Sequence, residues 1–167
     1  GSWDSNNPLV KPSAFKLPTT LHKPTDLKRE GNTLFADFGK ETFGFLTLRG
    51  VKGSGKINIY YGESKEEALS ITDTETTDLV EINTNTPKDT TMLLSKAFRF
   101  VNIVPSGNVN IENVEMQYEY AEVVDKGSFR CNDDLINRIY DVSKYTMHLN
   151  TREFFIDGIK RDRWVWS

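Results

Sequence analysis

The spacing of apolar residues divides the chain into a strand-rich part and a helical part. Between residues 33 and 130, apolar and polar residues alternate in short runs, which is the pattern of strands with one buried face. These runs cover residues 33–38, 43–49, 56–61, 79–82, 98–104 and 109–124. Because no helical spacing separates them, the pattern predicts a mainly β domain, an antiparallel β-sandwich of the jelly-roll type.

The connections between these runs carry turn and loop signals. Gly53, Ser54 and Gly55 predict a hairpin turn, and residues 105–108 predict the end of a strand. Residues 62–77 are polar and predict a long loop. Prolines recur between residues 8 and 24, so residues 3–26 are expected to be irregular.

From residue 132 the apolar spacing changes to that of a helix. Asn132 predicts the N-cap, and Asp133 and Asp134 fill a first turn where negative charge suits the helix dipole. One broad apolar stripe then follows, made by Leu135, Ile136, Ile139, Tyr140, Val142, Met147 and Leu149. The pattern predicts one amphipathic helix over residues 132–150.

Three segments follow from these signals. We expect an irregular lead-in over residues 1–32, a β-sandwich domain over residues 33–130, and the start of a helical domain over residues 131–167. The helical pattern begins late and the chain stops at Ser167, so the helical domain is expected to be unfinished.

Composition and charge exclude several classes of protein. The net charge is −3, from 21 basic and 24 acidic residues, and there is no basic stripe, so no nucleic acid is expected as a partner. No apolar run approaches the roughly 18 residues that a membrane helix needs. One cysteine, Cys131, excludes an internal disulfide. The chain opens with Gly1-Ser2 and no initiator methionine, which leaves the compartment open, with a periplasmic or extracellular place favoured.

No cofactor or metal site is predicted. Asp37-Phe38-Gly39 matches the magnesium motif of kinases in its letters, but the other kinase motifs are missing. His22 and His148 have no partners at ligand spacing. The acids Asp73, Glu75 and Asp78 miss the spacing of a calcium loop and fit a solvated acidic loop.

The densest chemistry lies at the C-terminal end, in residues 157–167. Two carboxylates, Asp157 and Asp162, lie there among Lys160, Arg161, Arg163, Trp164 and Trp166. Sugar-processing sites use such groups, because one carboxyl must hold a proton while another stays ionised. The same residues also fit a plain turn, a salt-bridged surface and two core tryptophans.

Several motifs of the chain recur together in one enzyme family. At the C-terminal end stands Asp157-Gly158-x-x-Arg161-Asp162-Arg163-x-x-Trp166-Ser167. Upstream stand Asp37-Phe38-Gly39-Lys40-Glu41-x-x-Gly44-Phe45-Leu46, Gly62-Glu63-Ser64, Ala97-Phe98-Arg99-Phe100-Val101 and Gly127-Ser128-Phe129-x-Cys131-Asn132-Asp133. Over residues 33–167 the chain resembles bacterial α-L-rhamnosidases, the inverting glycoside hydrolases of family 78.

The resemblance implies a β-sandwich packed on a catalytic (α/α)6 barrel, and it implies roles for four residues. Asp162 matches the acid that protonates the leaving oxygen, and Asp157, Arg161 and Trp166 match substrate-binding positions. The family usually has Glu where this chain has Asp162, and its signature continues to Gly and Asp after the position of Ser167. The general base is expected outside this chain.

We therefore expect a piece of an inverting glycosidase that releases α-L-rhamnose from rhamnose-containing carbohydrates, and that is inactive as a piece. The competing class is a non-catalytic carbohydrate-binding or structural β-sandwich. Without its barrel neighbours, the apolar segment over residues 132–166 is expected to pair with a second copy, which predicts a homo-oligomer.

Overall fold

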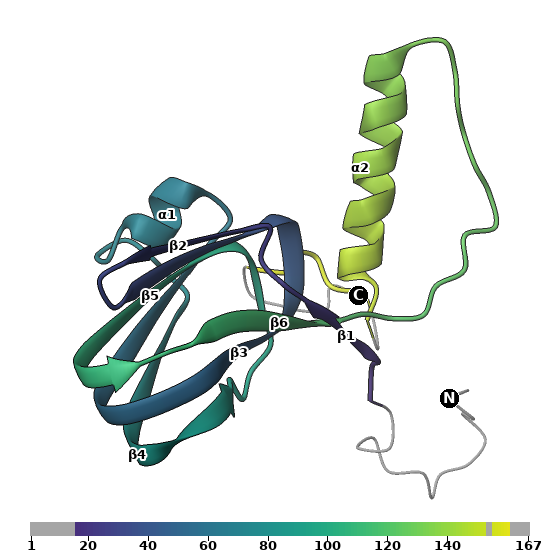
Figure 1. Ribbon diagram of the computed structural model, residues 1–167. Helices are drawn as coiled ribbons and strands as arrows, with labels where there is room; N and C mark the ends of the chain where they lie inside the picture. Colours follow the sequence, from purple (N-terminus) through teal and green to yellow (C-terminus); the bar gives the residue numbers. More distant parts are fainter. Residues whose placement is uncertain (1–15, 153–154, 161–167) are drawn as a thin grey trace, which may run out of the picture.

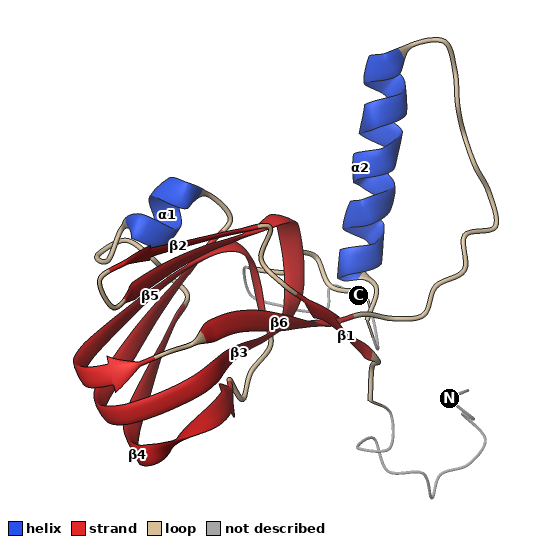
Figure 2. Cartoon of the chain, in the orientation of Figure 1, coloured by secondary structure: helices blue, strands red, loops and turns tan. Residues whose placement is uncertain are grey.

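The computed structural model describes residues 16–152 and 155–160, and it confirms the mainly β, antiparallel fold (Figures 1 and 2). The strands are β1 (Thr19–His22), β2 (Asp26–Glu30), β3 (Thr33–Gly62), β4 (Thr77–Thr91), β5 (Lys96–Asn110) and β6 (Asn113–Glu119). The helices are α1 (Lys65–Leu69) and α2 (Asp134–Asn150). The runs expected at 33–38, 43–49 and 56–61 are all parts of the single strand β3.

The 30-residue strand β3 organises the sandwich because it changes partners along its length. Its first part pairs with β2 and β5, its middle part with β6 and the end of β4, and its last part with β4 and β5. Its register against β5 shifts after Asp37 and again after Gly44, where the strand leaves one partner for the next. Such irregularities bend a strand, and here they let one strand contribute to both layers.

The two layers follow from these pairings. The first contains β2, β5, β4 and both ends of β3, so that Ile103 of β5 pairs with Leu34 on one side and Ile59 on the other. The second contains β1, β6 and the middle of β3. The core between them is formed by buried apolar side chains that include Leu34, Leu48, Ile57, Ile59, Tyr61, Phe98, Val101, Ile103, Val114 and Met116.

The prediction of a hairpin turn at residues 53–55 was wrong, and so was the end of a strand at residues 105–108. Both stretches lie inside long strands and face each other, with Gly55 opposite Gly107. A Cβ atom on Gly53 would lie 1.8 Å from the carbonyl oxygen of Asn108, and the φ angle of Gly53 is +116°. Glycine here marks a close approach of two strands. This is a role that glycine has in sheets besides its role in turns.

Three other expectations also need correction. Residues 19–22 and 26–30, within segments expected to be irregular, are the strands β1 and β2, and β1 pairs with β6. The run over 109–124 is interrupted, because β5 ends at Asn110 and β6 covers 113–119. The expected loop over 62–77 contains α1, whose N-cap Ser64 accepts a hydrogen bond from the Glu67 N–H at 3.1 Å. Five residues are too few for apolar periodicity to reveal a helix.

The helix α2 ends at Asn150 as expected but begins two residues late, at Asp134. Asp133 is the N-cap in place of Asn132, since its carboxylate accepts from the N–H groups of Leu135 at 2.8 Å and Ile136 at 3.2 Å. α2 stands away from the sandwich (Figure 1), and its side chains Leu135, Ile136, Ile139, Val142 and Met147 are exposed. Within the described ranges, neither helix is long and apolar enough to cross a bilayer.

Candidate functional site

The chain turns back toward the sandwich after α2, and this return carries the first residues of the predicted site. Thr151 forms an isolated β-bridge with Phe155, and the N–H of Ile156 donates to the carbonyl of Asn150 at 3.0 Å. Ile156 is buried, whereas Asp157, the next residue, is exposed. Of the predicted site residues, Asp157 is thus placed at the end of an anchored turn. Arg161, Asp162 and Trp166 lie outside the described residues.

Two contacts hold the C-terminal end of α2 on the sandwich. The hydroxyl of Tyr145 donates to the main-chain carbonyl of Glu41 at 2.5 Å, and the ammonium group of Lys40 lies 3.9 Å from the Tyr145 ring centre. The guanidinium of Arg152 donates to the carbonyl of Glu119 at 3.0 Å, pairs with the Glu119 carboxylate, and lies 4.1 Å from the centre of the Phe43 ring. Arginine over an aromatic face combines charge with packing, which suits a buried anchor.

A third contact reaches the predicted site segment itself. Lys160 forms an ion pair with Glu67, which lies in α1. Desolvation opposes the charged form of Lys160, but its hydrogen bond to the Glu67 carboxylate and the other nearby carboxylates outweigh it, so the pKa of Lys160 is raised. α1 therefore connects the sandwich to the segment that carries Asp157.

The side chain of Glu41 lies next to these contacts and is unusual. Both of its carboxyl oxygens are buried and have no hydrogen-bond partner in the described part of the chain. The pKa of Glu41 is raised to about 8, mainly by burial and then by the negative charge of Glu63, while the positive charge of Lys160 acts in the opposite direction. Glu41 is therefore mostly protonated at pH 7, and it lies near Lys160 of the segment that continues into the predicted site.

The Asp37-Phe38-Gly39 motif has a structural role in this region. The Arg99 guanidinium donates two hydrogen bonds to the Asp37 carboxylate, at 2.9 and 3.0 Å, and the Gly39 N–H donates to Asp37 at 2.7 Å. The hydrogen bond from Arg99 lowers the pKa of Asp37, against a smaller effect of burial. The motif fixes the bend at which β3 changes register, immediately before Glu41.

The acids of the 62–77 region and its neighbour Asp78 are engaged with other groups. Asp78 accepts from Lys96 at 2.8 and 2.9 Å and from the Tyr61 hydroxyl at 2.7 Å, and Asp73 accepts from Ser70 at 2.7 Å. Within residues 16–152 and 155–160, no three His, Cys, Asp or Glu side chains are grouped so as to hold a metal ion.

Four residues connect the sandwich to the end of α2 and the segment after it, or lie beside these contacts, and sequence reasoning assigned them no role: Glu41, Glu67, Tyr145 and Arg152. Glu41 does lie in one of the upstream motifs quoted above, directly after Asp37-Phe38-Gly39-Lys40. Its place in that motif was the available signal. Its burial was not readable from the chain, because burial depends on residues that only the fold brings together, such as Tyr145, whose hydroxyl meets the Glu41 carbonyl across 104 positions.

Comparison with known proteins gives one family match. The model of the family described as "Alpha-rhamnosidase-like, bacteroidetes, N-terminal" matches residues 1–103. A search among curated protein sequences found no match.

Solved structures with the same fold come from several rhamnosidases. The rhamnosidase from Klebsiella oxytoca with rhamnose bound has a TM-score of 0.75 and 16% identity, over 90% of this chain and 38% of that one. The family 78 rhamnosidase of Bacillus sp. GL1 has a TM-score of 0.68 and 20% identity, over 82% of this chain and 15% of that one. The α-L-rhamnosidase from Dictyoglumus thermophilum has a TM-score of 0.68 and 21% identity, over 89% and 18%. This chain thus spans less than two-fifths of each of these structures.

Proposed function

We propose a function on the premise that the chain belongs to the alpha-rhamnosidase-like N-terminal family of Bacteroidetes, as the match over residues 1–103 shows. The chain is the sandwich and the first catalytic segment of a bacterial α-L-rhamnosidase of carbohydrate metabolism. The whole enzyme releases terminal α-L-rhamnose from glycans or glycosides. The family match is the observation that carries this proposal.

The active-site roles are assigned to the segment that follows α2. Asp162 protonates the leaving oxygen, while Asp157 and Arg161 bind sugar hydroxyls and Trp166 forms a wall of the sugar pocket. The anchors described above support this assignment, because Tyr145, Arg152 and Lys160 tie both sides of the 151–160 turn to the sandwich. A catalytic carboxyl needs such support, since small displacements lower the rate strongly.

The chemistry proposed is hydrolysis with inversion at the anomeric carbon. An inverting site needs a protonated acid and an ionised base about 6.5–9.5 Å apart, with a water molecule between the base and the sugar. This chain supplies the acid, and we assign the base to residues beyond it. The isolated chain should therefore not hydrolyse an aryl α-L-rhamnoside, and a mutation-sensitive rate from the purified chain would contradict the assignment.

The roles of the two acids are separable by varying the leaving group in the full-length enzyme. Asp162→Asn should lower kcat strongly for rhamnosides with basic leaving groups and much less for activated aryl rhamnosides, because protonation matters most for a basic oxygen. Asp157→Asn should lower kcat/KM by a similar factor for all of them. Asp73→Asn, which changes an acid beside α1, is the control and should leave the rates unchanged. An equal loss for every leaving group with Asp162→Asn would remove Asp162 from the acid role.

Inversion at the anomeric carbon can be measured separately from the roles of the two acids. NMR of the first-formed sugar should show the anomer opposite to that of the substrate. A retained anomer would contradict inversion while leaving the substrate assignment intact.

We further propose that the exposed face of α2 packs on other helices of the catalytic domain in the whole enzyme. In the isolated 167-residue chain, the same face packs on a second molecule. Five apolar side chains of α2 are between 45% and 65% exposed. Burying a large apolar side chain contributes roughly 1.5–3 kcal/mol, so a face of this size favours a partner.

A further inference from the structure

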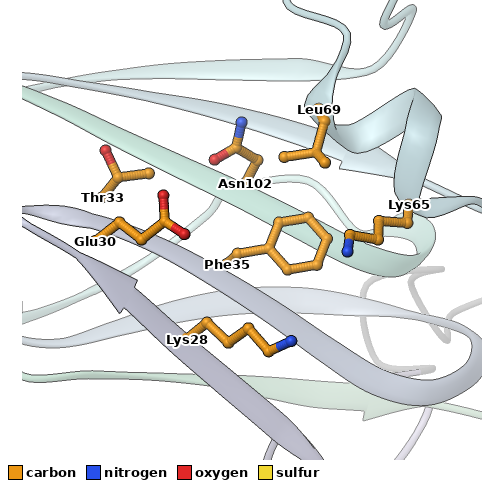
Figure 3. A pocket seen from close by; sticks show the side chains of 7 residues that line it. All are labelled: Lys28, Glu30, Thr33, Phe35, Lys65, Leu69 and Asn102. Atoms are coloured by element: carbon orange, nitrogen blue, oxygen red, sulfur yellow. The ribbon is translucent and has the colours of Figure 1, made fainter.

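A groove lies on the outer face of the first layer, between the strands and α1 (Figure 3). Its volume is about 230 Å³. The strand register places Lys28 of β2, Phe35 of β3 and Asn102 of β5 side by side across the sheet, because Lys28 pairs with Phe35 and Phe35 with Asn102. Leu69 and Lys65 of α1 close the groove on the other side.

The floor of this groove carries the carboxamide of Asn102. Asn102 is 6% exposed, and its carboxamide is not among the fully enclosed, unpartnered polar atoms of the described residues, so it is reached from the groove. A carboxamide can donate two hydrogen bonds and accept two, and buried amides are normally satisfied. Because Asn102 faces the groove (Figure 3), a ligand there can form hydrogen bonds with its carboxamide. A group that both donates and accepts, such as a sugar hydroxyl, fits both ends of the amide.

The walls of the groove are apolar. Phe35 is half-buried and packs against Phe100, with 6.0 Å between the ring centres. Leu69 lies across from it and is 48% exposed. An aromatic ring and a leucine side chain provide surface for the C–H face of a sugar ring, which a small inorganic anion would not use.

The rim of the groove is charged and favours one negative charge on the ligand. Lys28 and Lys65 contribute two positive charges, and Glu30 contributes one negative charge. The Lys65 ammonium group lies 5.9 Å from the centre of the Phe35 ring, and Lys65 forms no ion pair with a described residue. Lys28 contacts Asp26 at 3.6 Å, with both side chains mostly exposed, which is a weak interaction in water. The carboxylate of Glu30 and the hydroxyl of Thr33 complete the rim as acceptors for ligand hydroxyls.

We propose that this groove is a non-catalytic binding site for a uronic acid unit of a glycan. The sugar carboxylate lies between Lys28 and Lys65, the hydroxyls bind Asn102 and Glu30, and the ring packs on Phe35. The site lies on the sandwich, on strands β2, β3 and β5 and helix α1, and the proposal does not rest on the proposed hydrolase activity. It assigns the sandwich its own contact with an acidic polysaccharide.

The test is an NMR titration of the whole 167-residue chain, labelled with ¹⁵N. The probes are the methyl glycosides of galacturonic and glucuronic acid, with their neutral counterparts, methyl galactoside and methyl glucoside, and sodium acetate as the anion alone. The uronides should shift the side-chain amide of Asn102 and the backbone amides of Phe35 and Lys65. The neutral sugars should bind at least ten times more weakly, and acetate should not shift Asn102.

Variants separate binding from folding. Asn102→Ala should lower uronide affinity at least tenfold, and Lys65→Gln, at an exposed position of α1, should lower it about three- to tenfold with the fold intact. Lys56→Gln removes an exposed lysine of β3 outside the groove and should leave the affinity unchanged. The proposal is overturned if no probe shifts Asn102, if neutral and acidic sugars bind equally, if acetate reproduces the uronide shifts, or if Lys65→Gln has no effect.

Discussion

Replacing Glu41 by glutamine should flatten the pH dependence of stability and make the chain more stable at slightly alkaline pH. The folded chain buries both Glu41 carboxyl oxygens and raises the pKa of this group to about 8, from 4.5 in the unfolded chain. Between these two values, the unfolded chain releases the Glu41 proton and the folded chain keeps it. Rising pH therefore favours the unfolded chain, and the contribution of Glu41 to stability is lost progressively over this window.

The size of the effect follows from the two pKa values. Each pH unit between them lowers the free energy of unfolding by ~1.4 kcal/mol, so the full window corresponds to ~5 kcal/mol, which is an upper bound. Glutamine has the same shape and no charge, but its amide group is a buried donor without a partner, which costs about 1–3 kcal/mol. Glu41→Gln should therefore be less stable than the parent chain near pH 5 and more stable near pH 8, with a crossing point between.

Guanidinium unfolding at pH 5, 6, 7 and 8, followed by circular dichroism, measures this difference. Glu122→Gln is the matched control, because it removes one exposed carboxylate from the same chain. The difference in unfolding free energy between Glu41→Gln and the parent should change sign across the series, whereas that of Glu122→Gln should stay small. Parallel pH profiles for the parent and Glu41→Gln would show that Glu41 is ionised in the folded chain, and the reasoning would be refuted.

Three further predictions address the anchors, the strand pairing and the exposed helix. Arg152→Ala should lower the unfolding free energy by ~3 kcal/mol and speed hydrogen exchange over residues 145–157, because it leaves the Glu119 carboxylate half-buried without its partner; unchanged exchange there would contradict the anchor. Gly53→Ala should cost about 3 kcal/mol or more, since its Cβ would lie 1.8 Å from a carbonyl oxygen of β5, whereas Gly31→Ala, with a positive φ but nothing within 4 Å, should cost ~1 kcal/mol by thermal unfolding; equal losses would refute the close strand approach. By light scattering, the whole chain should be at least dimeric and a version that ends at Phe129 monomeric; two monomers would mean that α2 needs no second copy.

The sequence predicted the elements whose signal is local. Alternation over 43–49, 56–61 and 98–104 found strand residues, because inward and outward side chains differ in chemistry along each of these runs. The stripe from Leu135 to Leu149 found α2 to within two residues at its start. What failed was the connection between elements: three predicted strands are one strand, and a glycine pair that reads as two turns is one contact between β3 and β5. A glycine at a turn and a glycine at a close strand approach look the same in one sequence, since both reflect the missing Cβ.

For the candidate site, too, the sequence did not predict contacts between distant segments. Its chemical groups stand within eleven consecutive residues, so their types could be predicted from the chain. The support for them is not local. Lys160 pairs with Glu67, which is 93 positions away in the sequence, and Tyr145 donates to the carbonyl of Glu41, which is 104 positions away. The residues around Glu67 and Glu41 do not indicate these distant partners, because an ion pair or a single hydrogen bond needs only one suitable group at one place. The contacts of Tyr145, Arg152 and Lys160 hold on the sandwich the segment that leads into the predicted site. The sandwich therefore positions this segment. If this is its role, Arg152→Ala in the full-length enzyme should lower kcat for every leaving group alike, in contrast to Asp162→Asn, whose loss grows with the basicity of the leaving oxygen.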